Sequence, residues 1–174
     1  MSKLRIKPDI PRLYKAPRQL YRDTVHIFTD GSCFPNPGGP GGWAAVLIFN
    51  ELRKEVFGGA ARTTNNEMEL RGILEGLKML KSRKYPVIIY SDSQYSLNCV
   101  SAWHKGWAAR GWRTASGTPV KNVELIQEIV ALKTDNIVFK WVKGHIGITE
   151  NERADFLAGE GRRNHGKKEA ATCA

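Results

Sequence analysis

Residues 25–60 read VHIFTDGSCFPNPGGPGGWAAVLIFNELRKEVFGGA. The first six of these residues alternate in polarity and are rich in β-branched side chains, which is typical of a strand. A loop rich in glycine and proline, at 31–42, separates this strand from two further strand-like runs, at 43–49 and 53–60. We therefore expect three strands joined as a meander of hairpins.

Helical and strand-like patterns alternate in the rest of the chain. Residues 65–82 carry apolar side chains at helical spacing, and Thr64 with Glu67 matches a capping box at the start of that helix. Thr149 with Glu152 matches a second capping box. The further elements that we expect are a strand at 87–91, a helix at 93–100, a helix at 122–132, a strand at 136–142 and a helix at 150–160.

This order of elements predicts an α/β fold with a five-stranded mixed sheet flanked by helices. If the crossover is right-handed, the strands at 25–30 and 87–91 are parallel neighbours. Each of these runs ends in, or is followed by, an aspartate, Asp30 and Asp92. The two carboxylates should therefore meet at the edge of the sheet where ligands commonly bind.

Length and composition favour one globular domain at 24–161, between a basic, flexible leader at 1–23 and a polar basic tail at 162–174. No apolar run approaches the roughly 18 residues of a membrane span, and the N-terminus lacks the apolar core of a signal peptide. The three cysteines form no metal or redox motif. We expect a cytoplasmic protein with no membrane partner.

The chain carries a formal net charge of +10, which suggests a polyanionic partner. Much of the excess lies at the ends, with +5 on residues 1–24 and +3 on residues 162–174. Within the remaining +2, the segment 101–113 interleaves three tryptophans with three bases and holds no acid. Such a segment is typical of nucleic-acid binding.

Four acids stand out by their position, namely Asp30, Glu69, Asp92 and Asp155. Singly, each has an ordinary explanation: Asp30 could start a turn, Asp92 could cap a helix, and the other two could be helix-surface acids. Carboxylates that converge from separate elements instead suit a hard cation such as Mg²⁺, which prefers oxygen ligands.

The motifs around these acids resemble the type I, bacterial-type branch of the ribonuclease H family. The resemblance covers roughly residues 24–161 and rests on FTDGSCFPNPGGPGGWAAVL, TTNNEMEL, YSDSQY, GTPVKNVELI and WVKGHIGITENERADFLA, in that order. It implies a ribonuclease H-like fold with a basic protrusion, here Trp103–Trp112. It also implies hydrolysis of the RNA strand of an RNA–DNA hybrid, leaving 3′-hydroxyl and 5′-phosphate ends.

The resemblance assigns roles to individual residues. Asp30, Glu69, Asp92 and Asp155 would bind two Mg²⁺ ions when substrate is present, with Mn²⁺ as an alternative, and His145 would assist catalysis. Crowded carboxylates repel one another, and two cations would neutralise them. Contacts with the hybrid would come from Gly31, Ser32, Cys33, Asn36, Thr64, Asn65, Asn66, Gln94, Trp103 and Asn122, with Trp107 and Trp112 in the core.

Three other interpretations stay open on the sequence. A noncatalytic hybrid-binding protein could keep the fold, although all four acids are present. A reverse-transcriptase domain is disfavoured by Met1, the short leader and the lack of a polymerase segment. Transposases and Holliday-junction nucleases share the fold but not the paired motifs NNEMEL and GHxGxxENERAD.

We expect a monomer with no obligate protein partner. The loop at 33–42 is one residue longer than is common in the family, and Ile148 and Thr149 replace a polar residue and a proline.

Overall fold

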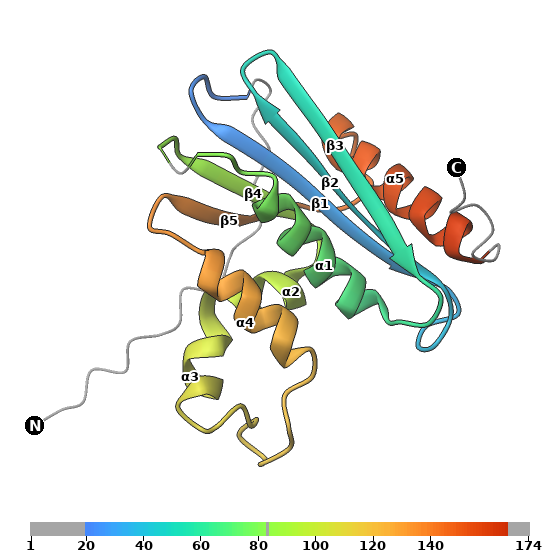
Figure 1. The fold of residues 1–174 in the computed structure, drawn as a ribbon, viewed down its shortest axis with the longest axis vertical. Helices are drawn as coiled ribbons and strands as arrows, with labels where there is room; N and C mark the ends of the chain where they lie inside the picture. The colour runs from blue at the N-terminus through green and yellow to red at the C-terminus, as the bar shows by residue number, and fades with distance from the viewer. Residues whose placement is uncertain (1–19, 83, 167–174) are drawn as a thin grey trace, which may run out of the picture.

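The structure is a computed structural model that describes residues 20–82 and 84–166. The expectations for residues 1–19 and 167–174 lie outside the described residues. Figure 1 shows a twisted sheet with helices on both sides and a smaller helical group at one end. The elements in chain order are β1 Val25–Cys33, β2 Gly41–Phe49, β3 Leu52–Ala60, α1 Asn65–Lys78, β4 Val87–Ser91, α2 Gln94–Asn98, the π-helical turn Cys99–Trp103, α3 His104–Ala108, α4 Val123–Leu132, β5 Ile137–Trp141 and α5 Thr149–Gly166.

The five strands form one sheet in the order β3-β2-β1-β4-β5. The first three strands are antiparallel hairpin partners, whereas β4 runs parallel to both β1 and β5. Thr29 of β1 pairs with Ser91 of β4, so the residues that follow them in the chain emerge at the same edge. The predicted mixed sheet and the parallel pairing of the two strands are confirmed.

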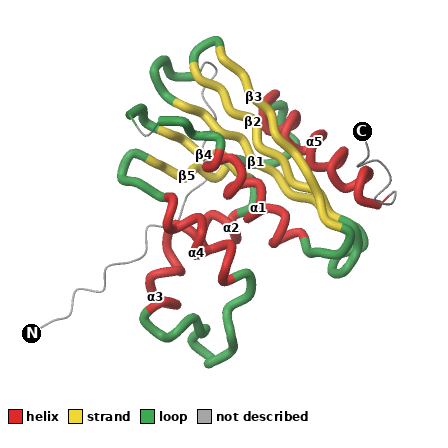
Figure 2. The backbone as a smooth tube through the Cα atoms, in the orientation of Figure 1, coloured by secondary structure: helices red, strands yellow, loops and turns green. Residues whose placement is uncertain are grey.

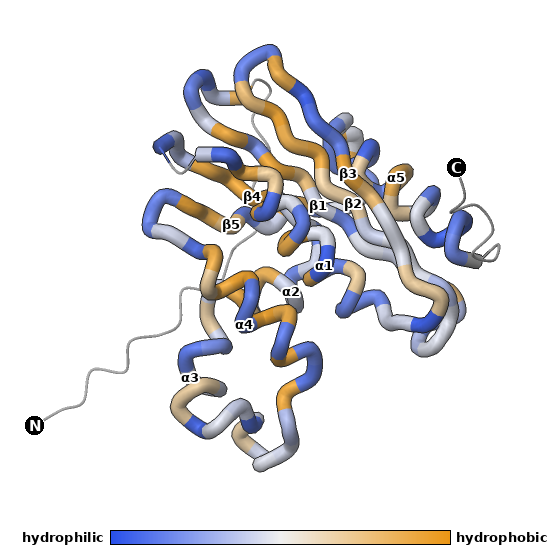
Figure 3. Tube along the Cα trace, in the orientation of Figure 1, coloured by the Kyte–Doolittle hydropathy of each residue, from blue (hydrophilic) through white to orange (hydrophobic). Residues whose placement is uncertain are grey.

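Each face of the sheet is covered by a helix that buries its own hydrophobic cluster. On one face, α1 packs with α4 and the α2–α3 segment around residues such as Ile27, Leu74 and Ile89. On the other face, the small side chains of α5 pack against Phe28 and Tyr90. Figure 3 shows hydrophobic colours along the inner strands and hydrophilic colours at their connecting turns. The central strand β1 is therefore buried on both faces.

Three helices differ in length from the prediction. Helix α1 ends at Lys78 rather than residue 82, because a turn begins after Met79 and leads to Pro86. The helix expected at 93–100 continues through a π-helical turn into α3 and ends at Ala108. Helix α5 runs on to Gly166, beyond the predicted residue 160. Figure 2 shows that the loop joining α3 to α4 projects away from the sheet.

The two predicted capping boxes have different outcomes. Thr64 is the N-cap of α1, and its hydroxyl accepts a hydrogen bond from the Glu67 amide at 3.2 Å. Thr149 is instead the first residue inside α5, so the second box is wrong in detail. The Glu152 carboxylate accepts from the Gly147 amide at 3.0 Å and so caps the helix through the preceding loop.

Among the helices that the structure describes, none combines the length and the apolar character that crossing a bilayer requires.

Candidate active site

Asp30 and Glu69 are brought together by a close approach of helix α1 to strand β1. Asp30 is buried near the end of β1, and Gly31 follows it. A Cβ atom at Gly31 would lie 2.2 Å from the Glu69 backbone nitrogen, so only glycine allows this approach. The sequence TDG therefore places the second turn of α1, with Glu69, directly against Asp30.

Asp92 joins them because β4 is parallel to β1 and in register with it. It follows Ser91, the partner of Thr29, at the carboxyl end of the strand. The next helix is capped by Ser93, whose hydroxyl accepts from the Ser96 amide, so the carboxylate of Asp92 is not needed as a cap. The predicted convergence of Asp30 and Asp92 at one sheet edge is therefore what the strand register produces.

Three carboxylates form a compact oxygen cluster. One oxygen each from Asp30, Glu69 and Asp92 lies within 4.8 Å of the others. Asp30 and Glu69 are buried, and Asp92 is half-buried. The Oε2 atom of Glu69 is buried with no hydrogen-bond partner. A buried carboxylate oxygen without a donor is costly, and a divalent cation is the natural partner for it.

Burial and mutual repulsion make these acids hard to ionise. Burial, with added repulsion from Asp92 and Asp155, raises the pKa of Asp30 to about 8. Burial likewise raises the pKa of Glu69 well above its usual value, and Asp30 adds to the effect. Burial raises the pKa of Asp92, although the nearby His145 opposes the shift. A cation among the oxygens would reverse this balance by favouring the charged forms.

The fourth predicted acid, Asp155, adjoins the cluster from helix α5. Its charge adds to the effect of burial in raising the pKa of Asp30, and its Oδ2 atom lies 3.7 Å from Nδ1 of His145. Its side chain is 47% exposed, and among the described residues it falls outside the compact group of three. Asp155 thus lies at the border between the cluster and solvent.

His145 lies on a loop that closes over one side of the cluster. Its imidazole is 77% exposed, and its backbone adopts a left-handed conformation with φ of 54°. A Cβ at Gly144 would lie 2.4 Å from Oδ2 of Asp92, so the loop passes directly against that carboxylate. The bond from the Gly147 amide to Glu152 fastens the other end of the loop to α5.

Five of the predicted substrate residues line one hollow at the start of α1, the helix that carries Glu69. The hollow has a volume of ≈ 540 Å³. Its walls are Asn36, Pro37, Thr64, Asn65, Asn66, Glu67, Tyr95, Lys121 and Asn122. Asn36, from the loop after β1, accepts a hydrogen bond from the Asn65 amide at 3.1 Å. This bond joins two of the four separate segments that surround the opening.

Sequence reasoning missed Tyr95 and Lys121 as walls of this hollow. Lys121 precedes the predicted Asn122, so the motif GTPVKNVELI already contained a signal for it. Tyr95 had no such signal, because only the turn from β4 into α2 directs it to this place. Its ring packs edge-on against Trp103, with ring centroids 6.0 Å apart.

The other predicted substrate residues are placed differently. Gln94 is exposed at the first position of α2, while Gly31 and Ser32 are half-buried near the end of β1. The Cys33 thiol is buried and points inward, within 3.5 Å of the carbonyl oxygens of Pro35, Gly39 and Thr63. Only its backbone is therefore free for the predicted contact.

The predicted protrusion mixes core and surface roles. The larger hydrophobic cluster partly buries all three tryptophans, Trp103, Trp107 and Trp112. Trp103 is therefore in the same class of exposure as the other two. Arg110 and Arg113 are exposed and donate to carbonyl oxygens of Arg113 and Gly117, respectively. These bonds order the projecting loop, and the remaining guanidinium donors stay available.

Comparison with known proteins gives consistent matches. A family model described as RNase H matches residues 22–163. The chain is 51% identical over 139 residues to a ribonuclease HI of Neisseria meningitidis serogroup B, covering 79% of this chain and 94% of that protein. It is 49% identical over 140 residues to a ribonuclease H of Thiobacillus denitrificans, covering 80% and 93%. Among solved structures, LC9-RNase H1, described as a type 1 RNase H with the type 2 active-site motif, superposes with a TM-score of 0.72 at 29% identity, covering 84% of this chain and 75% of that one.

Proposed function

Because the chain belongs to the ribonuclease H family, it is an enzyme that cleaves RNA within RNA–DNA hybrids, and we propose that it does so by two-metal-ion catalysis. The products of this proposed reaction carry 3′-hydroxyl and 5′-phosphate ends. The observation that carries the proposal is the cluster of Asp30, Glu69 and Asp92, with the unpartnered buried oxygen of Glu69 inside it.

The donor set fits hard divalent cations. All of its ligand atoms are carboxylate oxygens, which suits Mg²⁺, with Mn²⁺ as an alternative, and no soft sulfur or imidazole lies within the group of three. Asp155 completes the set from the solvent side, where a second ion and a phosphate could enter. When bound, two cations lower the pKa of a water and stabilise the oxygen that leaves.

The protein residues have two tasks around that centre. The buried carboxylates would hold the cations. The hollow at the start of α1 offers amide groups from four asparagines, the Lys121 ammonium and the Thr64 hydroxyl. Since the Thr64 oxygen accepts from the Glu67 amide, its proton remains free to donate to a phosphate of the DNA strand. Asn36, Asn65, Asn66 and Gln94 would contact the minor groove, where RNA 2′-hydroxyls distinguish the hybrid from DNA.

His145 is proposed to move a proton or to help product leave. Nδ1 of its exposed imidazole lies 3.7 Å from Oδ2 of the outer acid, Asp155, and imidazole is the side chain that most often acts as a general acid or base. We expect His145→Ala to reduce kcat by about 10²-fold while the Kd for hybrid changes little. Single-turnover kinetics and hybrid binding in Ca²⁺ measure the two quantities. A loss of binding as large as the loss of rate would contradict this role.

The proposal is tested by Mg²⁺-dependent cleavage of labelled substrates. Wild type should cut the RNA of a hybrid and leave double-stranded RNA intact. A DNA duplex that contains a single ribonucleotide tests whether one 2′-hydroxyl is enough for cleavage. Asp30→Asn should lose at least about 10³-fold in rate, because it removes a metal ligand without changing shape. Asp135→Asn, at an exposed turn after α4, is the matched control and should cleave normally. Equal activity of Asp30→Asn and wild type would refute the site.

A further inference from the structure

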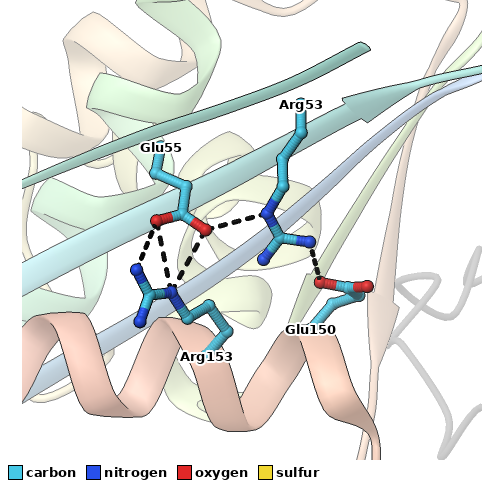
Figure 4. Close-up of polar contacts among 4 residues, drawn as sticks. All are labelled: Arg53, Glu55, Glu150 and Arg153. Atoms are coloured by element: carbon cyan, nitrogen blue, oxygen red, sulfur yellow. Dashed lines mark hydrogen bonds and ion pairs between the residues drawn. The ribbon is translucent and has the colours of Figure 1, made fainter. Parts of the chain in front are cut away.

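A network of four charged side chains joins the edge strand β3 to the first turns of α5 (Figure 4). Glu55 of β3 lies between two arginines. Its carboxylate accepts from Arg153 Nη2 at 2.8 Å and from Arg153 Nε at 3.1 Å, so that pair is bidentate. It also accepts from Arg53 Nε at 2.8 Å, and Arg53 in turn donates to Glu150 at 2.6 Å.

The network holds the first turns of α5, where apolar packing is sparse. Within residues 149–156 the buried apolar side chain is that of Ala154, which is small and resists sliding or rotation only slightly, and the larger Leu157 follows at the end of this span. The second half is held by backbone contact, since a Cβ at Gly161 would lie 2.1 Å from the Gly58 oxygen. Helix α5 is therefore fixed tightly at one end, and the ion network provides the directional contacts at the other.

Asp155 lies within the span that this network controls. It follows Arg153 by two residues, and it is the acid that reaches the buried cluster from α5. The same turns carry Glu152, which fastens the loop of His145 through the Gly147 amide. The three inner acids are positioned by the sheet and α1, whereas Asp155 and His145 depend on where α5 begins.

We propose that Arg53, Glu55, Glu150 and Arg153 are positioning residues for the reaction, which place Asp155 and the His145 loop against the other three acids. This inference rests on the proposed function of the site. The four side chains touch neither the cluster nor the hollow that the substrate would occupy. Their side chains are 23–41% exposed, so the network is half-buried and need not contribute much to overall stability.

The central test compares Glu55→Gln with Glu160→Gln. Glu55→Gln removes the charge shared by both arginines while keeping the shape of the side chain. Glu160 pairs with Arg163 on the same helix rather than with β3, so Glu160→Gln is the matched control. We expect Glu55→Gln to lower kcat by about tenfold with a KM for hybrid within about twofold, since misplacing an outer partner of a metal ligand has effects of this size. The control should keep the wild-type kcat.

Two readouts do not require turnover. Hydrogen exchange without metal should speed up at the amides of residues 150–155 in Glu55→Gln but not at 157–162. Isothermal titration with Mn²⁺ alone should show weaker binding by about tenfold. The melting temperature should fall by less than about 4 °C, as expected for a half-exposed ion network. An inactive wild type would refute the proposed function. Hydrogen exchange and Mn²⁺ binding would still show whether the network positions the start of α5, because neither measurement requires turnover.

A charge exchange provides the rescue. Glu55→Arg alone should impair the enzyme more than Glu55→Gln, because it places three cations together, and adding Arg153→Glu should restore most of the activity and the metal affinity. Arg153→Lys keeps the charge but loses the bidentate geometry, and should have an intermediate effect if Glu55 variants fold poorly. Wild-type behaviour of Glu55→Gln, an equal loss in Glu160→Gln, or failure of the double variant to recover would each overturn the proposal.

Discussion

Asp30 occupies a position that lowers the stability of the folded protein but suits a side chain that binds a cation. It lies in a buried strand, where a carboxylate has neither water nor a positive partner, and its neighbours Glu69 and Asp92 carry the same charge. Burial and this repulsion raise the pKa values of all three carboxyl groups. A protein without this activity would place a neutral side chain here, because an unpaired buried charge is strongly destabilising.

We predict that Asp30→Asn stabilises the protein in the absence of metal. The pKa of Asp30 is about 8 when folded and near its usual 3.8 when unfolded. This group therefore favours the folded state below pH 4 and loses that contribution as the pH rises through 8. At pH 9, in EDTA, the variant should gain about 2 kcal/mol in urea unfolding, and the gain should shrink at pH 6.

Added Mg²⁺ supplies the matching control for that measurement. It should raise the stability of wild type at pH 9, since a ligand that binds only the folded state shifts the equilibrium, and it should raise that of Asp30→Asn less. Equal stability of the two proteins at pH 9 without metal would show that the acids do not repel one another in the folded state.

The residues of the site were predictable from sequence where one motif carried them. The four acids and Thr64, Asn65 and Asn66 each stand in a continuous motif. The structure brings Asp30, Glu69 and Asp92 into the cluster and Thr64, Asn65 and Asn66 around the hollow, while Asp155 adjoins the cluster from α5. Tyr95 could not be found in this way, because its place depends on how the turn after β4 directs α2. The partial burial of Trp103 could not be predicted from the local sequence either, because it depends on packing against Tyr95 and Trp107.

At the level of elements, α5 is defined by how closely it lies on the sheet. A Cβ at Gly42 of β2 would lie 2.1 Å from the Ala158 oxygen, and Gly161 of the helix meets Gly58 as closely. The sequence predicts an end of this helix at residue 160, because the residues from 162 onwards are polar and basic like a tail. Glycine at 161 also lowers helix propensity. The helix continues to Gly166 because close packing against β2 and β3 outweighs the local preference.

This contact predicts opposite effects for two identical substitutions in α5. Gly161→Ala should destabilise the protein by about 2 kcal/mol or more, because its Cβ would meet backbone atoms that cannot yield. Gly159→Ala meets only the flexible end of Arg163, at 3.4 Å, and should stabilise by about 0.5–1 kcal/mol through helix propensity. Urea unfolding of both variants measures the difference. Equal effects of the two changes would contradict the packing argument.

For the whole molecule, the arrangement of the sheet and the distribution of charge have separate origins. The parallel pair β1 and β4 follows from the handedness of a crossover connection and was predictable. The charge lies largely towards the ends of the sequence. Leu20 packs against the smaller hydrophobic cluster, and the Tyr21 carbonyl lies 3.2 Å from Nε2 of His26, so the folded part includes these residues.

A truncation that begins at Leu20 should separate affinity from catalysis. It removes six bases and one acid, a net charge of +5, and keeps the interactions of Leu20 and Tyr21. We expect kcat at saturating hybrid to stay unchanged and affinity at low salt to fall. The slope of log affinity against log salt should become shallower by about 0.9 for each phosphate that the shortened protein no longer neutralises. A slope equal to that of the full chain would show that residues 1–19 neutralise no phosphate.

The placement of Asp155 on α5 also has a consequence for the order in which the protein becomes competent during its synthesis. A ribosome releases β1, α1 and β4 long before α5, and domains fold as their segments emerge. A nascent chain that ends before Thr149 already contains the three inner acids but lacks the fourth, the anchored end of the His145 loop and the cover of one sheet face. If Asp155 binds metal as proposed, hydrolysis has to await the final helix, and the growing polypeptide does not attack RNA before that helix is made.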